Sequence, residues 1–190
     1  MLQPGDPIPA FRLMAEAGEI RSADLAGRRY VLYLYPKDDT PGCTTEACNF
    51  RDNLPRFADM GVPIYGVSPD SAASHAKFAK KHGLNFPLLA DPERKLIEAL
   101  GAWVEKSLYG RQYMGVQRST FVVGPDGRIE KVWEKVTPEG HAAEVIAYLQ
   151  APSGTAEKRA AKPTAKKPAG KKSAAGKTAR STTSTKSQSR

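Results

Sequence analysis

The amino-acid sequence predicts an α/β domain with three layers, in which a central mixed sheet is flanked by helices, followed by a disordered basic tail. Three observations lead to this prediction. Short apolar segments alternate with segments of helical periodicity, a Gly-Pro-Asp-Gly turn signal marks a late hairpin, and the composition changes sharply after Gln150.

The first predicted strand is the apolar run Tyr30–Tyr35, which is rich in β-branched and aromatic residues and is stopped by Pro36. Residues 62–67 (VPIYGV) predict a second strand of the same kind. Between the two strands, residues 44–60 carry apolar side chains at helical spacing and therefore predict a helix. Pro55 is expected to kink this helix or to end it about one turn early, because proline removes a backbone donor.

Two further helices are predicted in the middle of the chain. The first runs through residues 71–81, with Asp70 or Ser71 as its N-terminal cap and Gly83 at its C-terminal end. The second covers residues 92–100, where a proline in the first turn is typical of a helix start and a glycine follows the last residue.

Residues 119–123 predict a third strand, and the Gly-Pro-Asp-Gly turn over residues 124–127 leads into a fourth. The pattern after this turn is divided, because four apolar residues also fit helical spacing: Ile129, Val132, Trp133 and Val136. The strand is preferred because the turn chemistry favours a hairpin, and because Thr137-Pro138 then starts a new helix with Glu139 in its first turn.

The chain of 190 residues divides into a domain over residues 1–150 and a tail over residues 151–190. The net charge of +9 is unevenly distributed, because the domain carries 18 Lys and Arg against 19 Asp and Glu, whereas the tail carries 11 against 1. The tail contains no aromatic residue, leucine or isoleucine, so it cannot bury enough apolar surface to offset the entropy of ordering. We therefore expect it to be disordered.

The opening MLQPGDPIPAF has no basic segment followed by an apolar one, and no apolar run approaches the roughly 18 residues of a membrane span. A cytoplasmic protein without membrane contacts is therefore expected. In a reducing cytoplasm, two cysteines are more often reactive, metal-binding or simply buried than joined in a permanent disulfide.

The two cysteines, Cys43 and Cys48, both fall in the stretch YPKDDTPGCTTEAC. If Cys43 lies in the first turn of the predicted helix and Cys48 in its interior, their α-carbons lie roughly 8 to 9 Å apart and their side chains diverge by about 140°. A disulfide needs α-carbons within about 7 Å and converging side chains. The thiols therefore cannot bond while the helix is wound but can meet once it unwinds locally, which suits a switch better than a permanent crosslink.

The position of Cys43 also predicts a reactive thiolate. This residue follows Thr40-Pro41-Gly42 and lies where unsatisfied N–H groups and the helix dipole favour a negative charge. A thiolate exposed at a helix N-terminus attacks peroxides to give a sulfenic acid, which a second thiol nearby converts to a disulfide.

Other interpretations of the cysteines stay open at this point. A buried, inert pair is one of them, because free cysteine is among the most buried residue types. A zinc site is disfavoured because His75, His82 and His141 have no ligand spacing to the cysteines, and no metal is expected. These histidines are expected to face solvent or to fill ordinary helix positions. The C-x-x-x-x-C spacing likewise disfavours a thioredoxin-type dithiol, which has C-x-x-C.

The motif Pro36-x-x-x-Thr40-x-x-Cys43 resembles the active-site motif of the peroxiredoxins. The longer stretch YPKDDTPGCTTEAC resembles the subgroup called bacterioferritin comigratory protein, or peroxiredoxin Q. The resemblance continues in YGRQYMGVQRSTFVVGPDGRI, which spans residues 109–129, and extends more loosely over residues 3–150. It does not include the tail.

The resemblance implies a thioredoxin-like fold and a thiol-dependent peroxidase that reduces hydrogen peroxide and organic hydroperoxides. It further implies thioredoxin as the reductant and a monomeric protein, and it implies no cofactor.

Carried over by position, the resemblance implies that Cys43 is the peroxidatic nucleophile and that Cys48 is the resolving thiol of a redox-active disulfide between the two. Thr40 would orient the peroxide through its hydroxyl, Pro36 would shield the thiolate from water, and Arg118 would complete the pocket. A guanidinium beside the thiolate would hold it ionised and stabilise charge while the O–O bond breaks.

The acidic residues near the motif are interpreted mainly as loop and first-turn charges. Asp38 and Asp39 are expected in a loop, and Glu46 in the first turn of the helix, where the helix dipole favours a carboxylate. Glu46 is also expected within reach of Arg118.

The basic tail over residues 151–190 resembles the lysine- and alanine-rich tails of linker histones in composition. A flexible segment with this charge would bind nucleic acid non-specifically through counterion release, although a solvating tail without a partner is an equal alternative. The runner-up function is therefore a nucleic-acid-associated redox protein. A disulfide oxidoreductase that acts on other proteins is a third.

Overall fold

A computed structural model describes residues 1–108 and 110–151 of the chain. The predicted disordered tail therefore lies outside the described residues, apart from Ala151, and the boundary at residue 150 stays a prediction. Along the chain the elements are β1 (Arg12–Ala15), β2 (Gly18–Arg21), η1 (Ser22–Leu25), β3 (Tyr30–Leu34), α1 (Pro41–Asp59), β4 (Ile64–Ser68), α2 (Ala72–His82), β5 (Leu88–Ala90), α3 (Lys95–Ala99), β6 (Trp103–Leu108), β7 (Arg111–Val116), β8 (Ser119–Val123), β9 (Ile129–Trp133) and α4 (His141–Gln150).

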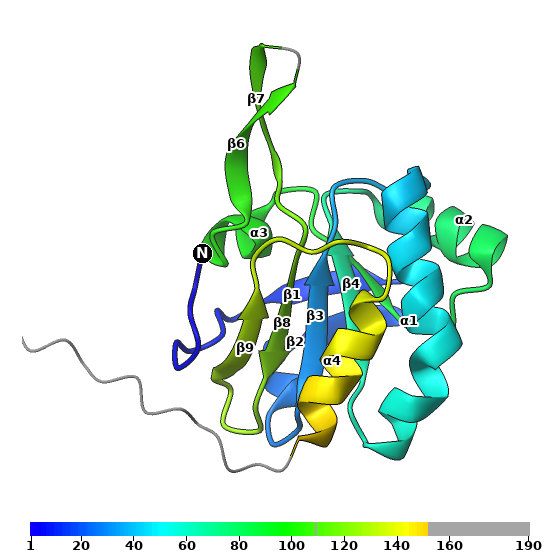
Figure 1. The fold of residues 1–190 in the computed structure, drawn as a ribbon, viewed down its shortest axis with the longest axis vertical. Coiled ribbons are helices and arrows are strands. Elements are labelled where there is room, and N and C mark those ends of the chain that lie inside the picture. Colours follow the sequence, from blue (N-terminus) through cyan, green and yellow to red (C-terminus); the bar gives the residue numbers. More distant parts are fainter. Residues whose placement is uncertain (109, 152–190) are drawn as a thin grey trace, which may run out of the picture. The chain divides into compact units, whose positions relative to one another are not determined.

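The central sheet has seven strands in the order β2-β1-β5-β4-β3-β8-β9 and is mixed, as predicted. Strands β3, β4 and β5 are parallel, whereas β8 pairs antiparallel with β3 and β9 antiparallel with β8. Helices α1 and α4 lie side by side over one face of this sheet (Figure 1). This arrangement is the thioredoxin-like α/β fold that the resemblance implied.

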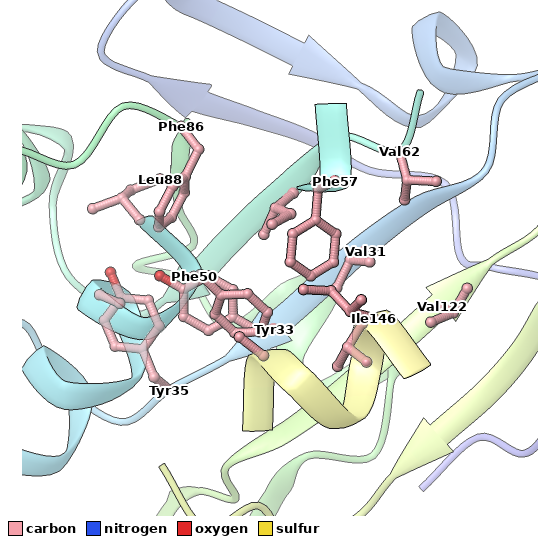
Figure 2. Packing of buried hydrophobic residues seen from close by; sticks show 14 of the residues in the cluster. Val31, Tyr33, Tyr35, Phe50, Phe57, Val62, Phe86, Leu88, Val122 and Ile146 are labelled. Carbon is pink, nitrogen blue, oxygen red and sulfur yellow. The ribbon is translucent and has the colours of Figure 1, made fainter. Parts of the chain in front are cut away.

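Strand β3 lies inside the sheet, between β4 and β8, and contributes side chains to both layers of the core. Val31 and Tyr33 belong to the cluster on the side of α1 and α4, whereas Leu32 and Leu34 belong to the cluster on the opposite face. This alternation follows from the two-residue repeat of a strand. Figure 2 shows the first cluster, in which Tyr33 stacks on Phe50 of α1 with 4.8 Å between ring centroids.

Helix α1 continues through Pro55 to Asp59, so the expectation that proline ends it a turn earlier is wrong. Phe50 and Phe57, on either side of the proline, are both fully buried in the core. Burying two aromatic side chains stabilises the helix by more than the loss of one backbone hydrogen bond destabilises it.

Two predicted helices begin three or four residues later than expected. Helix α3 begins at Lys95 instead of Pro92, because Arg94 takes a left-handed conformation with φ of 58° and the Asp91 carboxylate accepts a hydrogen bond from the Ile97 N–H at 2.9 Å. Helix α4 begins at His141 instead of at Thr137-Pro138, because Gly140 precedes it with φ of 76°. The prolines lie in the turns that lead into these helices.

The hairpin formed by β6 and β7 was not predicted from the sequence. These strands lie between α3 and β8 along the chain. They form a separate two-stranded sheet, which projects from the domain (Figure 1). The other predicted elements are confirmed, including the hairpin of β8 and β9 and helix α2, whose caps are Ser71 and Gly83. In the described ranges no helix has the length and apolar composition to cross a membrane.

Candidate active site

Cys43 is the third residue of α1, which begins with Pro41 directly after the loop that follows β3. Proline is common at the first position of a helix, where its missing N–H leaves no hydrogen bond unmade. The side chain of Cys43 is only 1% exposed, so the expectation of an exposed thiolate is wrong for this structure. The residue lies on the same face of α1 as Ala47 and Phe50, which pack against the sheet.

Arg118 lies against Cys43 because of strand register. It directly precedes β8, whose first residue Ser119 pairs with Leu34 at the end of β3, and α1 starts a few residues beyond Leu34. The Nη2 atom of Arg118 donates to Cys43 Sγ at 3.2 Å. Gly42 permits this approach, because a Cβ atom at that position would lie 3.3 Å from Nη2.

Glu46 is the second partner of Arg118. It lies beyond the first turn of α1 and is fully buried, so its interpretation as a first-turn charge is wrong. Arg118 Nη1 donates to its Oε2 atom in a buried ion pair, which agrees with the expectation that the two residues are within reach. Glu46 Oε1 and the Tyr33 hydroxyl are buried and have no hydrogen-bond partner among the described residues.

The spacing in the sequence could have revealed the burial of Glu46. Residues three or four apart share a helix face, and Glu46 is three residues after Cys43 and four before Phe50. A carboxylate on an apolar helix face must be paired, because leaving it unpaired in the core is very costly.

The electrostatics of the cluster favour a charged guanidinium. Burial alone would lower the pKa of Arg118, but the charges of Glu46 and Cys43 outweigh this effect and raise it. Burial raises the pKa of Glu46 to about 7, although the contact with Arg118 opposes the shift. A thiolate at Cys43 is therefore compensated by a fixed positive charge within hydrogen-bond distance.

The raised pKa of Glu46 gives a pH dependence of stability. From its ordinary pKa of 4.5 to about 7, the folded state holds a proton that the unfolded chain has released, so this group's contribution to stability falls as pH rises. Glu46→Gln removes the contribution. As the pH rises from 5 to 8, we expect the free energy of unfolding of the parent to fall by about 2 kcal/mol relative to that of the variant. Urea unfolding followed by circular dichroism measures this difference, and parallel pH curves for the two proteins would contradict it.

The other two motif residues border the start of α1. Thr40 is the N-cap of this helix and is half-buried, and its hydroxyl donates to the Lys37 carbonyl at 3.1 Å. Pro36 is also half-buried and directly follows the buried Tyr35. Their side chains therefore flank the same helix terminus that carries Cys43, and their roles stay predictions.

Cys48 is half-buried in the interior of α1, and both thiols are free. The helix is continuous from Pro41 to Asp59, so the two side chains diverge by about 140°. A disulfide between them requires the first turns of α1 to unwind, as the sequence geometry indicates. No group of three or more potential metal-binding side chains occurs within residues 1–108 and 110–151.

Several polar residues near the motif are buried, although Asp38 lies in a loop and His75 and His141 lie in helices, as expected. Asp38 is 8% exposed and contacts His75, which is itself 1% exposed. His141 of α4 is also buried, and its Nε2 atom lies 2.8 Å from the Thr120 hydroxyl. Asp39 lies in the same loop and is exposed.

A thioredoxin-like sheet, with a cysteine at a helix N-terminus against an arginine and a second cysteine on the same helix, defines the class of thiol-dependent peroxidases. Comparison with known proteins agrees with this class. The chain belongs to the AhpC/TSA family, whose model matches residues 4–132.

Named relatives place the chain among the peroxiredoxins of the Bcp or peroxiredoxin Q kind. It is 48% identical over 147 residues to peroxiredoxin Bcp of Bacillus subtilis, covering 77% of this chain and 94% of the relative. It is 39% identical over 150 residues to peroxiredoxin Bcp of Escherichia coli, covering 78% and 96%.

Solved structures give the same result. The bacterioferritin comigratory protein of Xanthomonas campestris matches with a TM-score of 0.71 and 42% identity, covering 74% of this chain and 90% of that one. A peroxiredoxin Q variant from Xylella fastidiosa matches with a TM-score of 0.75 and 37% identity, covering 80% and 97%. The recognition of the subgroup from the motif is therefore confirmed.

Proposed function

We propose that the chain reduces hydrogen peroxide and organic hydroperoxides through Cys43, with Cys48 as the resolving thiol and thioredoxin as the reductant. The observation that carries this proposal is the contact between Arg118 Nη2 and Cys43 Sγ at the N-terminus of α1. A guanidinium in this position stabilises both the thiolate before the reaction and the negative charge that develops on the peroxide oxygens.

In the first step the Cys43 thiolate attacks one oxygen of the hydroperoxide. An S–O bond forms and the O–O bond breaks, so the sulfur is oxidised by two electrons and the second oxygen leaves as an alkoxide or hydroxide. The leaving oxygen takes up a proton to give an alcohol or water, and Cys43 becomes a sulfenic acid. No general base is needed when the nucleophile is a thiolate.

In the second step α1 unwinds locally and the Cys48 sulfur attacks the sulfenic acid. The S–S bond forms and the S–O bond breaks, and the hydroxide leaves with the Cys48 proton as water. Thioredoxin then supplies two electrons and two protons by thiol–disulfide exchange, which restores both thiols. Because both thiols lie in one helix of one chain, this cycle needs no second subunit, which supports a monomer.

Thr40 and Pro36 have supporting roles in this proposal. A threonine hydroxyl can donate one hydrogen bond and accept others, which suits a peroxide oxygen that changes from substrate to leaving group. Pro36 would exclude water from the thiolate. An organic substrate fits the similar Xanthomonas protein, which has alkyl peroxide reduction activity.

The comparisons give no support to the alternative of a nucleic-acid-associated redox protein, because the named relatives are peroxiredoxins. The relatives and solved structures named above cover at most about four fifths of this chain, so they give no information on the function of the tail.

The intact mass of the non-reduced protein tests the proposal. After one equivalent of hydrogen peroxide we expect a loss of two hydrogens, about 2 Da, and a peptide map that joins Cys43 to Cys48. The Cys48→Ser variant provides the control and should instead gain one oxygen on Cys43. An unchanged mass in the parent protein would contradict the proposal, as would a bridge that joins two chains.

A further inference from the structure

Two adjacent aspartates fasten the loop before α1 to helix α2. This loop, residues 36–40, carries the motif residues Pro36 and Thr40 and is called the motif loop below. Asp38 is buried against the first turn of α2, whereas Asp39 lies on the surface beside the last turn of the same helix.

Asp38 accepts three hydrogen bonds with short donor–acceptor distances. Its carboxylate oxygens lie 2.6 Å from the Ser74 hydroxyl, 2.8 Å from the Tyr35 hydroxyl and 2.9 Å from His75 Nδ1. Because a carboxylate only accepts, Nδ1 carries the proton and donates. The backbone N–H of Asp38 in turn donates to the Asp70 carboxylate at 2.8 Å.

The contacts determine the charge state of Asp38. Burial alone would raise the pKa of this carboxyl group, but the hydrogen bonds from His75, Ser74 and Tyr35 outweigh burial and lower it. The group is therefore an ionised acceptor at neutral pH. The Nε2 atom of His75 is buried and has no partner among the described residues, so the ring is held through Nδ1 alone.

The second anchor is Asp39, whose backbone has a φ of 57° in the left-handed region. This conformation is unfavourable for a residue with a side chain and persists where surrounding contacts hold it. Asp39 accepts from Lys81 Nζ at 2.5 Å and lies 2.9 Å from His82 Nε2. The motif loop is thus held in a strained turn by contacts at both of its aspartates.

Within residues 1–108 and 110–151, no hydrogen bond joins these α2 residues to the cluster of Cys43, Glu46 and Arg118. We propose that Asp38 and His75 form a positioning pair, which holds the motif loop and the first turn of α1 in the arrangement that reacts with peroxide and opposes the unwinding that brings Cys48 to Cys43. This inference rests on the proposed peroxidase function and names residues that control the balance between its two steps.

Loss of the pair has opposite effects on the two steps. Unwinding the first turn of α1 displaces the adjoining loop, and it therefore withdraws Asp38 from donors that stay buried without an acceptor. Breaking the pair in advance removes this cost, so disulfide formation becomes faster. The reactive arrangement becomes less populated, so attack on peroxide becomes slower.

The test compares His75→Phe with His75→Asn. The asparagine side-chain nitrogen can take the place of Nδ1 and donate to Asp38, whereas phenylalanine fills the space without a donor. By stopped flow we expect His75→Phe to lower the second-order rate constant for hydrogen peroxide about tenfold and to raise the rate of Cys43–Cys48 disulfide formation several-fold. His75→Asn should keep both rates within about twofold of the parent. The second rate is followed by acid quenching and intact mass.

Two further variants separate positioning from loss of stability. Ser71→Ala removes the hydroxyl that caps α2 by accepting from the Ser74 N–H at 3.3 Å. It should lower stability and leave the ratio of the two rates unchanged. Ser74→Ala removes one donor to Asp38 and should shift the ratio in the same direction as His75→Phe by a smaller factor, which keeps the test decisive if the phenylalanine variant does not fold.

Two results would overturn the positioning role. In the first, both rates fall together in His75→Phe and in Ser71→Ala, which indicates a structural effect only. In the second, both rates stay unchanged in His75→Phe and Ser74→Ala. If the parent protein itself does not react with peroxide, the proposed function fails and this inference fails with it, and that outcome is visible in the parent alone.

Discussion

Cys43→Ser is expected to reduce peroxide consumption to the uncatalysed level. The serine hydroxyl remains protonated at neutral pH and cannot replace a thiolate as the nucleophile, even with Arg118 in place. The measurement is the loss of hydrogen peroxide in the presence of thioredoxin, thioredoxin reductase and NADPH. Cys43 is buried and has 1% of its surface exposed, so serine, which is close to it in size, should leave the fold intact.

Two variants serve as controls for this prediction. Deletion of residues 151–190 should leave the rate unchanged, because the residues of the proposed cycle all lie before that segment. Cys48→Ser should complete one reaction with peroxide and then stop, leaving a sulfenic acid that a dimedone label detects. Continued turnover by Cys43→Ser would show that another group reduces peroxide, and loss of activity on deletion of the tail would show that the domain is incomplete without it.

Removal of Arg118 is expected to lower the second-order rate constant for hydrogen peroxide by about 10²- to 10³-fold. This is the usual cost of losing one fixed donor to a developing negative charge. A simple Arg118→Ala change would also leave the Glu46 carboxyl group without a partner in the core, which is destabilising by itself. The effect is therefore measured as the ratio between Glu46→Gln and the double variant Glu46→Gln/Arg118→Met, in which neither protein carries an unpaired buried carboxylate.

Arg29 provides a matched control for this experiment. Its side chain is partly buried and forms an ion pair with Glu130 at 3.0 Å, at the opposite end of β3 from the cysteine. Arg29→Met should change the peroxide rate by less than twofold. If the double variant reacts with peroxide as fast as Glu46→Gln alone, Arg118 has no part in the chemistry and the proposed site must be revised.

The centre of the fold could be predicted from the sequence because its signals are local. Strand β3 is a short apolar run bounded by proline, α1 has an apolar face that repeats with helical period, and the β8–β9 hairpin has a strong turn signal. The late starts of α3 and α4 could not be predicted in this way. They depend on the left-handed conformations of Arg94 and Gly140 and on the side chain of Asp91, which tertiary contacts determine.

The site shows the same division between local and distant effects. The motif and the spacing of the two cysteines point to Cys43 and Cys48 directly. The burial of Glu46, Asp38 and His75 depends on partners 72 and 37 residues away along the chain. Aspartate is mostly exposed and histidine is intermediate, so the sequence alone does not predict the burial of Asp38 and His75. Only for Glu46 does the spacing to Cys43 and Phe50 indicate the core face of α1.

The central claim is that Arg118 and the N-terminus of α1 stabilise the Cys43 thiolate that attacks peroxide. The most direct measurement is the rate at which Cys48→Ser forms a sulfenic acid on Cys43 with hydrogen peroxide, compared between this variant carrying Glu46→Gln and this variant carrying Glu46→Gln/Arg118→Met. We predict that the loss of Arg118 lowers this rate by about 10²- to 10³-fold. Equal rates with and without Arg118 would contradict the account.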